Sequence, residues 1–122
     1  MNSEQIVRDF CNAVPRRDVK ALVAFFTPDA VYHNIPIAPV VGHEAIESVL
    51  RQFLDPSSEA EFEIVALASV ENTVLTERID RFVLNGKKIE LPVMGAFEVT
   101  AEGKISAWRD YFDMASFTKQ AS

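Results

Sequence analysis

The sequence of 122 residues has a single cysteine, no long apolar run and a shortage of basic residues. One cysteine, Cys11, cannot form a disulfide within the chain, so nothing favours an oxidising compartment. No segment approaches the roughly 20 uninterrupted apolar residues of a membrane-spanning helix. The polar N-terminal stretch MNSEQIVRDF also lacks the apolar run of a signal peptide. We therefore expect a cytoplasmic protein without a membrane partner.

Charge and ligand spacing argue against two further classes. The 18 acidic residues outnumber the 12 basic ones, which gives a formal net charge of −6. Proteins bind nucleic-acid backbones through Lys and Arg side chains that neutralise phosphates, and the sequence has neither a basic run nor a Gly-rich phosphate loop. Asp29, His33 and His43 fall on different predicted elements without the spacing of metal ligands. We expect no nucleic-acid partner and no metal.

Apolar bulk is what the sequence does have. Hydrophobic residues make up 48% of it, with nine Phe and one Trp, so residues 1–122 can form one domain around a real core or an apolar pocket. Cys11 lies in an apolar pattern and is interpreted as a small buried hydrophobe rather than a nucleophile.

The N-terminal half of the chain has the spacing of amphipathic helices. Helices are expected over residues 3–14, from Asp18 to Phe26, and over residues 44–53. Asn2 with Gln5 could form a capping box on the first helix, and Asp18 is a good N-cap for the second. The segment TPDA (27–30) predicts a turn. A short strand, VYHNIPI, and a Pro-containing loop ending at Gly42 follow it.

From Glu59 the apolar period changes to two, which predicts strands. The first, residues 60–70, is expected to place Phe62, Ile64, Ala66 and Ala68 on one face. A second strand (74–84) leads into Asn85-Gly86, a strong type I′ hairpin signal. A third strand runs from Lys87 to Val99, the segment AEGK forms a turn, and a fourth strand covers 105–113. A short amphipathic tail, ASFTKQ, closes the chain.

Helices followed by antiparallel strands indicate an α+β fold with the helices on one face of the sheet. Three helices can cover only one side of four long strands. The sheet must therefore curl around its contents, dimerise through its open face, or do both. Because soluble proteins rarely leave large apolar patches bare, we expect a homodimer.

Polar residues interrupt three of the apolar faces. In VLTERIDRFVL (74–84), Arg78 and Asp80 share a face with Val74, Phe82 and Leu84. Asp110 lies between Trp108 and Phe112 on one face of the last strand, while Tyr32 and Asn34 share a face and His33 points away from them. His33 is interpreted as structural or at the surface, and His43 as an early helix residue.

If these polar residues face one cavity, their chemistry is that of hydrolysis. A guanidinium can bind two carboxylates at once, and two converging carboxylates rarely both ionise. The pair Asp80 and Asp110 would then supply one acid and one base, with Tyr32 and Asn34 holding a water molecule. The alternative is a structural Arg–Asp bridge, with Asp110 on a solvated sheet edge; periodicity alone does not bring these residues together.

The segments LTERID and WRDYFD, with an upstream Y-x-N, resemble the limonene-1,2-epoxide hydrolase family. The resemblance runs from the first helix to about Phe117. It implies the cone-shaped α+β fold of the NTF2-like (SnoaL-like, cystatin-like) group, in which a curved mixed or antiparallel sheet carries three N-terminal helices on one face. Ketosteroid isomerases and polyketide cyclases share that fold. The best-known family members also carry an N-terminal extension, which this chain is expected to lack.

The resemblance assigns roles to the polar residues. Asp110 falls on the base, Asp80 on the acid and Arg78 on the group that links them, while Tyr32 and Asn34 fall on the residues that position water. It implies that a hydrophobic epoxide is opened to a vicinal diol in one displacement, without a cofactor or a covalent intermediate.

The substrate pocket is a further expectation. Its predicted lining comprises Phe62, Ile64, Thr76, Phe82, Leu91, Met94, Trp108 and Phe112; ordinary core packing is the alternative for each. Two other functions remain open from the sequence. One is an isomerase or cyclase of the same fold, which would use a single carboxylate and an oxyanion hole. The other is a non-catalytic module that binds a small molecule, because fold does not fix function.

Overall fold

Helices occupy the N-terminal part of the chain and long strands the C-terminal part, as the change of period predicts. The computed structural model describes residues 2–122. The elements follow in the order α1 (Ser3–Ala13), η1 (Val14–Arg16), α2 (Val19–Val23), β1 (Phe26–Asn34), β2 (Val40–Val41), α3 (His43–Leu54), β3 (Ser57–Val70), β4 (Thr73–Leu84), β5 (Lys87–Val99), β6 (Ile105–Tyr111) and α4 (Met114–Ala121). The three expected N-terminal helices are thus confirmed.

Side chains cap the first two helices at the predicted positions. Asn2 accepts hydrogen bonds from the backbone N–H groups of Glu4 and Gln5, at 2.9 and 3.4 Å. The Gln5 side chain binds Asp9 instead of returning to Asn2, so only half of the expected capping box forms. Asp18 caps α2 by accepting from the N–H of Ala21 at 3.2 Å. Among residues 2–122, the helices fall short of the length and apolar character that crossing a membrane requires.

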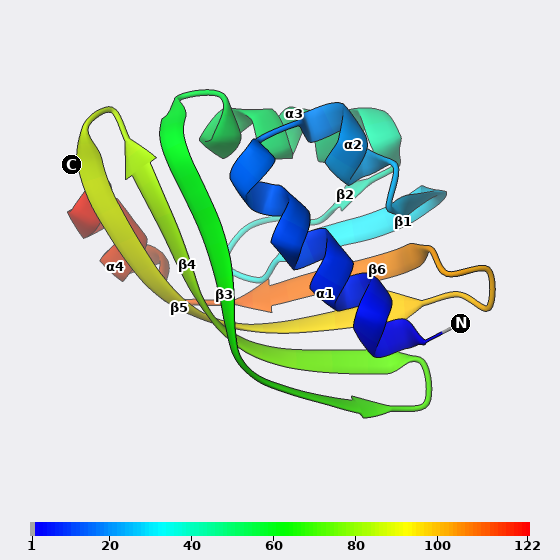
Figure 1. The fold of residues 1–122 in the computed structure, drawn as a ribbon. Helices are drawn as coiled ribbons and strands as arrows, with labels where there is room; N and C mark the ends of the chain where they lie inside the picture. Colours follow the sequence, from blue (N-terminus) through cyan, green and yellow to red (C-terminus); the bar gives the residue numbers. More distant parts are fainter. Residues whose placement is uncertain (1) are drawn as a thin grey trace.

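All strands belong to one six-stranded sheet with the order β2-β1-β6-β5-β4-β3. Neighbouring strands are antiparallel except for β1 and β6, which run parallel. Asn85 and Gly86 both have positive φ, 53° and 79°, which confirms the predicted hairpin between β4 and β5. The sheet bends strongly, with α1 across one side and α3 over one end (Figure 1). The expected α+β fold, a curved mixed sheet with N-terminal helices on one face, is confirmed.

The predicted turn at residues 27–30 is wrong, because β1 begins at Phe26 and runs straight through it. The pairing of β1 with β6 is irregular between Phe26 and Val31, and β2 pairs only with Val31 and Tyr32 in the described part of the chain. Pro28 therefore lies where few ladder hydrogen bonds form, so its missing N–H is tolerated in a strand.

A bulge in β3 changes the faces predicted for that strand. The register with β4 shifts between Ile64 and Ala66, which leaves Val65 55% exposed. Beyond the shift, Ala66 is exposed and Leu67 packs against the core. The expectation that Ala66 and Ala68 share the inner face with Phe62 is therefore wrong.

The core lies between the helices and the concave face of the sheet, with Trp108 at its centre. Phe10 of α1 meets the Trp108 ring edge-on, with 5.0 Å between the centroids, and Phe97 stacks on it from β5 at 5.5 Å. Cys11 is buried next to Phe10, and this burial raises the pKa of its thiol to about 12. Cys11 is therefore the small buried hydrophobe that the sequence predicts.

Candidate active site

Strand β4 directs a charged pair, Arg78 and Asp80, toward the protein interior. Its alternation buries Thr76, Arg78 and Asp80 on the same face as Val74 and Phe82, as predicted. The Arg78 side chain is 0% exposed and that of Asp80 is 6% exposed. A buried guanidinium must have partners for its charge and its N–H groups, so the neighbouring strands have to supply acceptors.

Sheet order brings the remaining polar residues to this pair. The parallel pairing of β1 with β6 sets Tyr32 beside Trp108 and Asn34 beside Asp110. Asp110 is next to Gly95 of β5, which is next to Thr76 of β4. Asn34, Asp110, Gly95 and Thr76 thus form a row across four adjacent strands.

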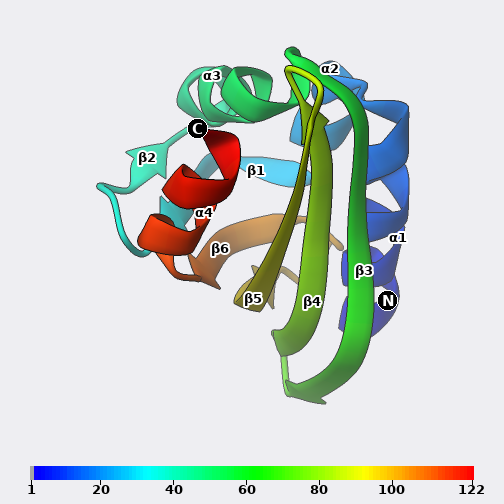
Figure 2. The same ribbon diagram turned by 90° about the vertical axis from the view of Figure 1, so that its left-hand side faces the viewer.

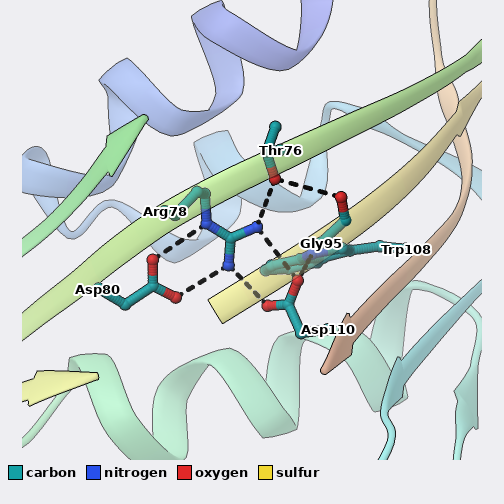
Figure 3. A network of polar contacts seen from close by, with 6 residues as sticks. All are labelled: Thr76, Arg78, Asp80, Gly95, Trp108 and Asp110. Carbon is teal, nitrogen blue, oxygen red and sulfur yellow. Dashed lines mark hydrogen bonds and ion pairs between the residues drawn. The ribbon is translucent and has the colours of Figure 1, made fainter. Parts of the chain in front are cut away.

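Arg78 uses every N–H of its guanidinium group (Figure 3). Its Nε and Nη2 donate to Asp80 at 3.0 and 2.9 Å. Its Nη2 and Nη1 donate to Asp110 at 2.8 and 3.1 Å, and Nη1 also donates to Thr76 Oγ1 at 3.2 Å. The two carboxylates therefore converge on one cation, and the alternative of Asp110 on a solvated edge is excluded.

Gly95 makes room for this network. A Cβ atom at position 95 would lie 2.6 Å from Asp110 Oδ1 and closer still to Arg78 Nη1. The carbonyl of Gly95 accepts a hydrogen bond from Thr76 Oγ1 at 3.2 Å, so the same residue also anchors the end of the network (Figure 3). Only glycine lets the β5 backbone approach the ion pair this closely.

Aromatic rings surround the ion pairs. Trp108 donates its indole N–H to Asp110 Oδ1 at 2.7 Å, and the Tyr32 ring stacks on the indole, with the centroids 4.0 Å apart and the planes 6° apart. The Arg78 guanidinium carbon lies 4.7 Å from the centroid of the Phe62 ring and 5.8 Å from that of Phe97. These faces stabilise the cation through cation–π attraction while they keep water away.

Burial favours the protonated form of one of the two carboxylates, Asp80. It raises the pKa of Asp80 to about 6, against the opposing effect of Arg78. Burial works against the charged form of Arg78 as well, yet the carboxylates of Asp110 and Asp80 raise its pKa well above the ordinary value. Tyr32 has its pKa raised by burial and by the nearby charge of Asp110, so its phenol keeps its proton. The site thus holds a permanent cation and one carboxyl that is readily protonated.

A cavity of about 360 Å³ opens onto this network. Tyr32, Asn34, Asp80 and Asp110 line its polar end. Apolar side chains supply most of the remaining wall: Ile37, Val49, Phe53, Phe62, Phe82, Leu84, Leu91, Val93, Phe112, Met114 and Phe117. Such a cavity accepts an apolar molecule and presents a single reactive end to it.

The predicted pocket residues divide into three groups. Phe62, Phe82, Leu91 and Phe112 line the cavity. Ile64 packs against the core, while Thr76 and Trp108 are buried in the polar network. Met94 is 53% exposed, so its predicted place in the pocket is wrong. The alternation of β5 is unbroken there, and it turns Leu91 and Val93 inward and Met94 outward.

Several residues of the site were missed from the sequence, among them Gly95 and the cavity-lining Val93 of β5. Extending the alternation from Leu91 along β5 identifies both, because Leu91, Val93 and Gly95 share the inner face. The polar part of Trp108 was also missed. Its ring was expected in the pocket wall, whereas its N–H donates to Asp110.

Neither histidine belongs to the site. His33 donates from Nε2 to the carbonyl of Ile37 at 3.0 Å, and His43, at the start of α3, donates from Nε2 to the carbonyl of Phe26 at 2.8 Å. Within residues 2–122, no group of three or more His, Cys, Asp or Glu side chains is arranged to hold a metal ion.

Comparison with known proteins identifies relatives of the whole chain. The family model of the limonene-1,2-epoxide hydrolase catalytic domain matches residues 1–122. The epoxide hydrolase EphG of Mycobacterium tuberculosis is 31% identical over 113 residues, which cover 93% of this chain and 74% of EphG.

Solved structures agree with this family. An M. tuberculosis limonene-epoxide-hydrolase-like epoxide hydrolase is 29% identical, with a TM-score of 0.84 over 98% of this chain and 88% of its own. A candidate polyketide cyclase from Xanthomonas campestris pv. campestris shares the fold, with a TM-score of 0.86 at 21% identity, over 98% of this chain and 96% of its own. With its buried Arg78 between two aspartates and a family match along its full length, the chain belongs to the limonene-1,2-epoxide hydrolase family.

Proposed function

We propose that the protein hydrolyses a hydrophobic epoxide to a vicinal diol in one step. Asp110 is the base that removes a proton from water, and Asp80 is the acid that protonates the epoxide oxygen. Arg78 links the two carboxylates, while Tyr32 and Asn34 hold the water molecule together with Asp110. The observation that carries this proposal is the single guanidinium nitrogen, Arg78 Nη2, bound to Asp80 at 2.9 Å and to Asp110 at 2.8 Å.

The proton transfers balance across the site. Water loses a proton to Asp110 as its oxygen attacks an epoxide carbon, and the ring C–O bond breaks as Asp80 gives its proton to the leaving oxygen. The reaction leaves Asp110 protonated and Asp80 charged, and transfer of a proton from Asp110 to Asp80 through solvent restores the resting state. Because the negative charge moves from one partner of Arg78 to the other, the buried site stays neutral throughout.

The electrostatics support these roles. An acid must hold its proton near the working pH, and burial raises the pKa of Asp80 to about 6. Asp110 accepts hydrogen bonds from Trp108 and from two nitrogens of Arg78. These bonds fix the orientation of the Asp110 carboxyl group in the cavity wall.

The cavity supports an apolar substrate. Its volume of about 360 Å³ is at the lower end of the roughly 300–1,000 Å³ typical of ligand pockets. Phe62 and Leu91, which both line the cavity, pair across the sheet with Asp80 from either side. A neutral epoxide with a hydrocarbon body loses little hydration on entering such a site, whereas a charged substrate would meet few groups to compensate it.

Proton transfer next to a carbonyl, the reaction of ketosteroid isomerases, suits this geometry less well. That reaction needs a strong base and hydrogen-bond donors for an enolate oxygen. Here the N–H groups of Arg78 are already taken up by Asp80, Asp110 and Thr76, so they are not free to bind an enolate oxygen. A pure binding module would not require two carboxylates to share a buried cation.

A single turnover in ¹⁸O-labelled water tests the proposal. With 1,2-epoxydecane as the substrate and the enzyme in excess, we expect label in the diol and none in the protein. Label in Asp80 or Asp110 would show a covalent ester intermediate and overturn the one-step route. A parallel incubation with a 5-ene-3-ketosteroid should give no isomerised product; isomerisation without epoxide opening would favour the other reaction of this fold.

We also propose that the protein acts as a homodimer through the outer face of the sheet. Leu75, Met94 and Tyr111 are 46%, 53% and 49% exposed on that face, on strands β4, β5 and β6. Met94 lies opposite Tyr111 and, on its other side, opposite Glu77. An apolar patch across three strands of a rigid sheet favours contact with a second copy.

A further inference from the structure

The C-terminal helix α4 forms the outer wall of the cavity without a core of its own. Asp113 caps it by accepting from the N–H groups of Ala115 and Ser116. No side chain of Met114–Ala121 is fully buried, yet Met114 and Phe117 line the cavity. Figure 2 shows α4 lying in front of the curved sheet, below α3 and beside β5. Its position therefore decides how far the cavity extends.

Gln120 joins this helix to the sheet. The backbone N–H of Glu90 donates to Gln120 Oε1 at 2.7 Å, and Gln120 Nε2 donates back to the Glu90 carbonyl at 3.0 Å. Nε2 also donates to Ser116 Oγ on the same helix, at 3.2 Å. The amide of one side chain thus satisfies both backbone groups of one strand residue.

This contact occurs where β5 has lost its strand neighbour. In the described chain β6 pairs with β5 only along residues 94–99, whereas β4 pairs with β5 from Lys87 onward. Glu90 therefore lies on a free edge of the sheet, where an unpaired N–H and C=O would otherwise face solvent. Gln120 makes the pair of bonds that an adjacent strand residue would make.

The free edge is close to the reacting groups. Glu90 precedes Leu91, which lines the cavity and pairs across the sheet with Asp80. The Glu90 carboxylate accepts a hydrogen bond from Arg81 Nε of β4 at 2.8 Å, on the exposed surface of the sheet. A bond from α4 to this point sets the distance between the outer wall and the acid.

We propose that Gln120 is a positioning residue that seats α4 on the edge of β5 and so selects long hydrocarbon epoxides. This proposal rests on the proposed function and names the substrate class of that site, which is terminal epoxides whose chain reaches Met114 and Phe117. A helix as short as Met114–Ala121 is marginal without tertiary contacts. Loss of the two bonds to Glu90 lets α4 move away and removes the apolar wall that a long substrate contacts.

The first test compares Gln120→Ala with wild type on 1,2-epoxybutane and 1,2-epoxydecane. The ratio of kcat/KM for the long over the short epoxide should fall about 10-fold, mainly through KM for the long one, since one methylene in an apolar pocket discriminates by about 10- to 200-fold. The kcat for the short epoxide should change less than about 2-fold, because the polar end is untouched. Lys119→Ala, an exposed neighbour on α4, is the matched control and should leave the ratio unchanged.

A double-mutant cycle tests whether Gln120 acts on substrate choice through the apolar wall that α4 forms. Phe117→Ala should lower the same ratio, and adding Gln120→Ala to it should lower the ratio no further, because the wall contact is already gone. Effects that multiply, or a Gln120→Ala ratio equal to that of wild type, would overturn the role of Gln120.

Binding separates this inference from the proposed hydrolysis. Calorimetry with 1,2-decanediol, which needs no turnover, should show weaker binding to Gln120→Ala and unchanged binding to Lys119→Ala. If the wild type opened no epoxide but bound the diol in this Gln120-dependent way, the hydrolysis proposal would fail and the role of Gln120 would stand. If wild type opened epoxides and neither the ratio nor diol binding responded to Gln120→Ala, the role of Gln120 would fail and the hydrolysis proposal would stand.

Discussion

The indole N–H of Trp108 donates a hydrogen bond to Asp110 Oδ1 over 2.7 Å, two residues further along the same strand. With the bonds from Arg78, Asp110 receives donors on both oxygens and a second donor on Oδ1, whereas Asp80 receives only the donors of Arg78 among the described residues. An indole can donate but not accept. The indole therefore holds the Asp110 carboxyl as an acceptor, in addition to the bonds from Arg78.

Replacement of Trp108 by Phe should lower kcat for an apolar epoxide by about 10- to 100-fold, because a hydrogen bond to a charged group contributes about 1.5–3 kcal/mol. The aromatic ring that stacks on Tyr32 is kept, so substrate binding should change little. Steady-state kinetics measure the effect. Phe26→Leu changes packing next to Trp108 without removing a polar group, and it should lower stability but keep most of kcat. Full activity in Trp108→Phe would show that Asp110 does not depend on the indole.

The variant Asp110→Asn should lose about 10²- to 10⁴-fold in kcat, since an amide cannot take the proton from water. Folding should survive, because the amide oxygen can still accept from Arg78. Kinetics with circular dichroism check both parts. Asp29→Asn, an exposed aspartate on β1, is the matched control and should be fully active. An Asp110→Asn protein with activity near that of wild type would remove Asp110 as the base.

Activity should decrease as the pH rises above about 6. There Asp80 loses the proton that it must donate, because burial raises its pKa to about 6, and kcat/KM should fall as pH increases further. The midpoint of this fall is an apparent constant of the carboxylate pair rather than of Asp80 alone. A rate that climbs steadily from pH 6 to 9 would contradict Asp80 as the acid.

Sedimentation should show a dimer at micromolar concentration. Met94→Asp places a charge in the apolar patch on the outer face of the sheet, and it should shift the protein to monomers without unfolding it. Arg8→Glu changes the charge in the same direction on an exposed position of α1 and serves as the control. The homodimer proposal fails if the wild type sediments as a monomer under these conditions.

Local pattern predicted what each strand presents to its two faces. The charged pair Arg78 and Asp80 could be placed inward because β4 alternates without interruption. The bulge in β3 has no signal in the apolar pattern, so the faces of this strand beyond Ile64 were predicted wrongly. Met94 was misplaced for a different reason. It is an odd number of positions from Leu91, so the regular alternation of β5 places the two residues on opposite faces.

The convergence of the site could not be predicted from periodicity. Asn34 and Asp110 lie side by side because β6 inserts next to β1 in parallel, and sheet order is a property of the whole fold. Family resemblance supplied that information from its motifs. It did not identify Gly95, whose importance appears only when the β5 backbone is seen against Arg78 and Asp110.

The last strand along the chain is an inner strand of the sheet. Within the sheet, β6 is the strand that joins β1 and β2 to the meander of β3, β4 and β5. Until β6 has been synthesised, Arg78 therefore has only one of its two acid partners, and Tyr32 lacks the indole on which it stacks. The active centre is completed only after β6 has been synthesised, and a chain that stops short of β6 has no centre to complete.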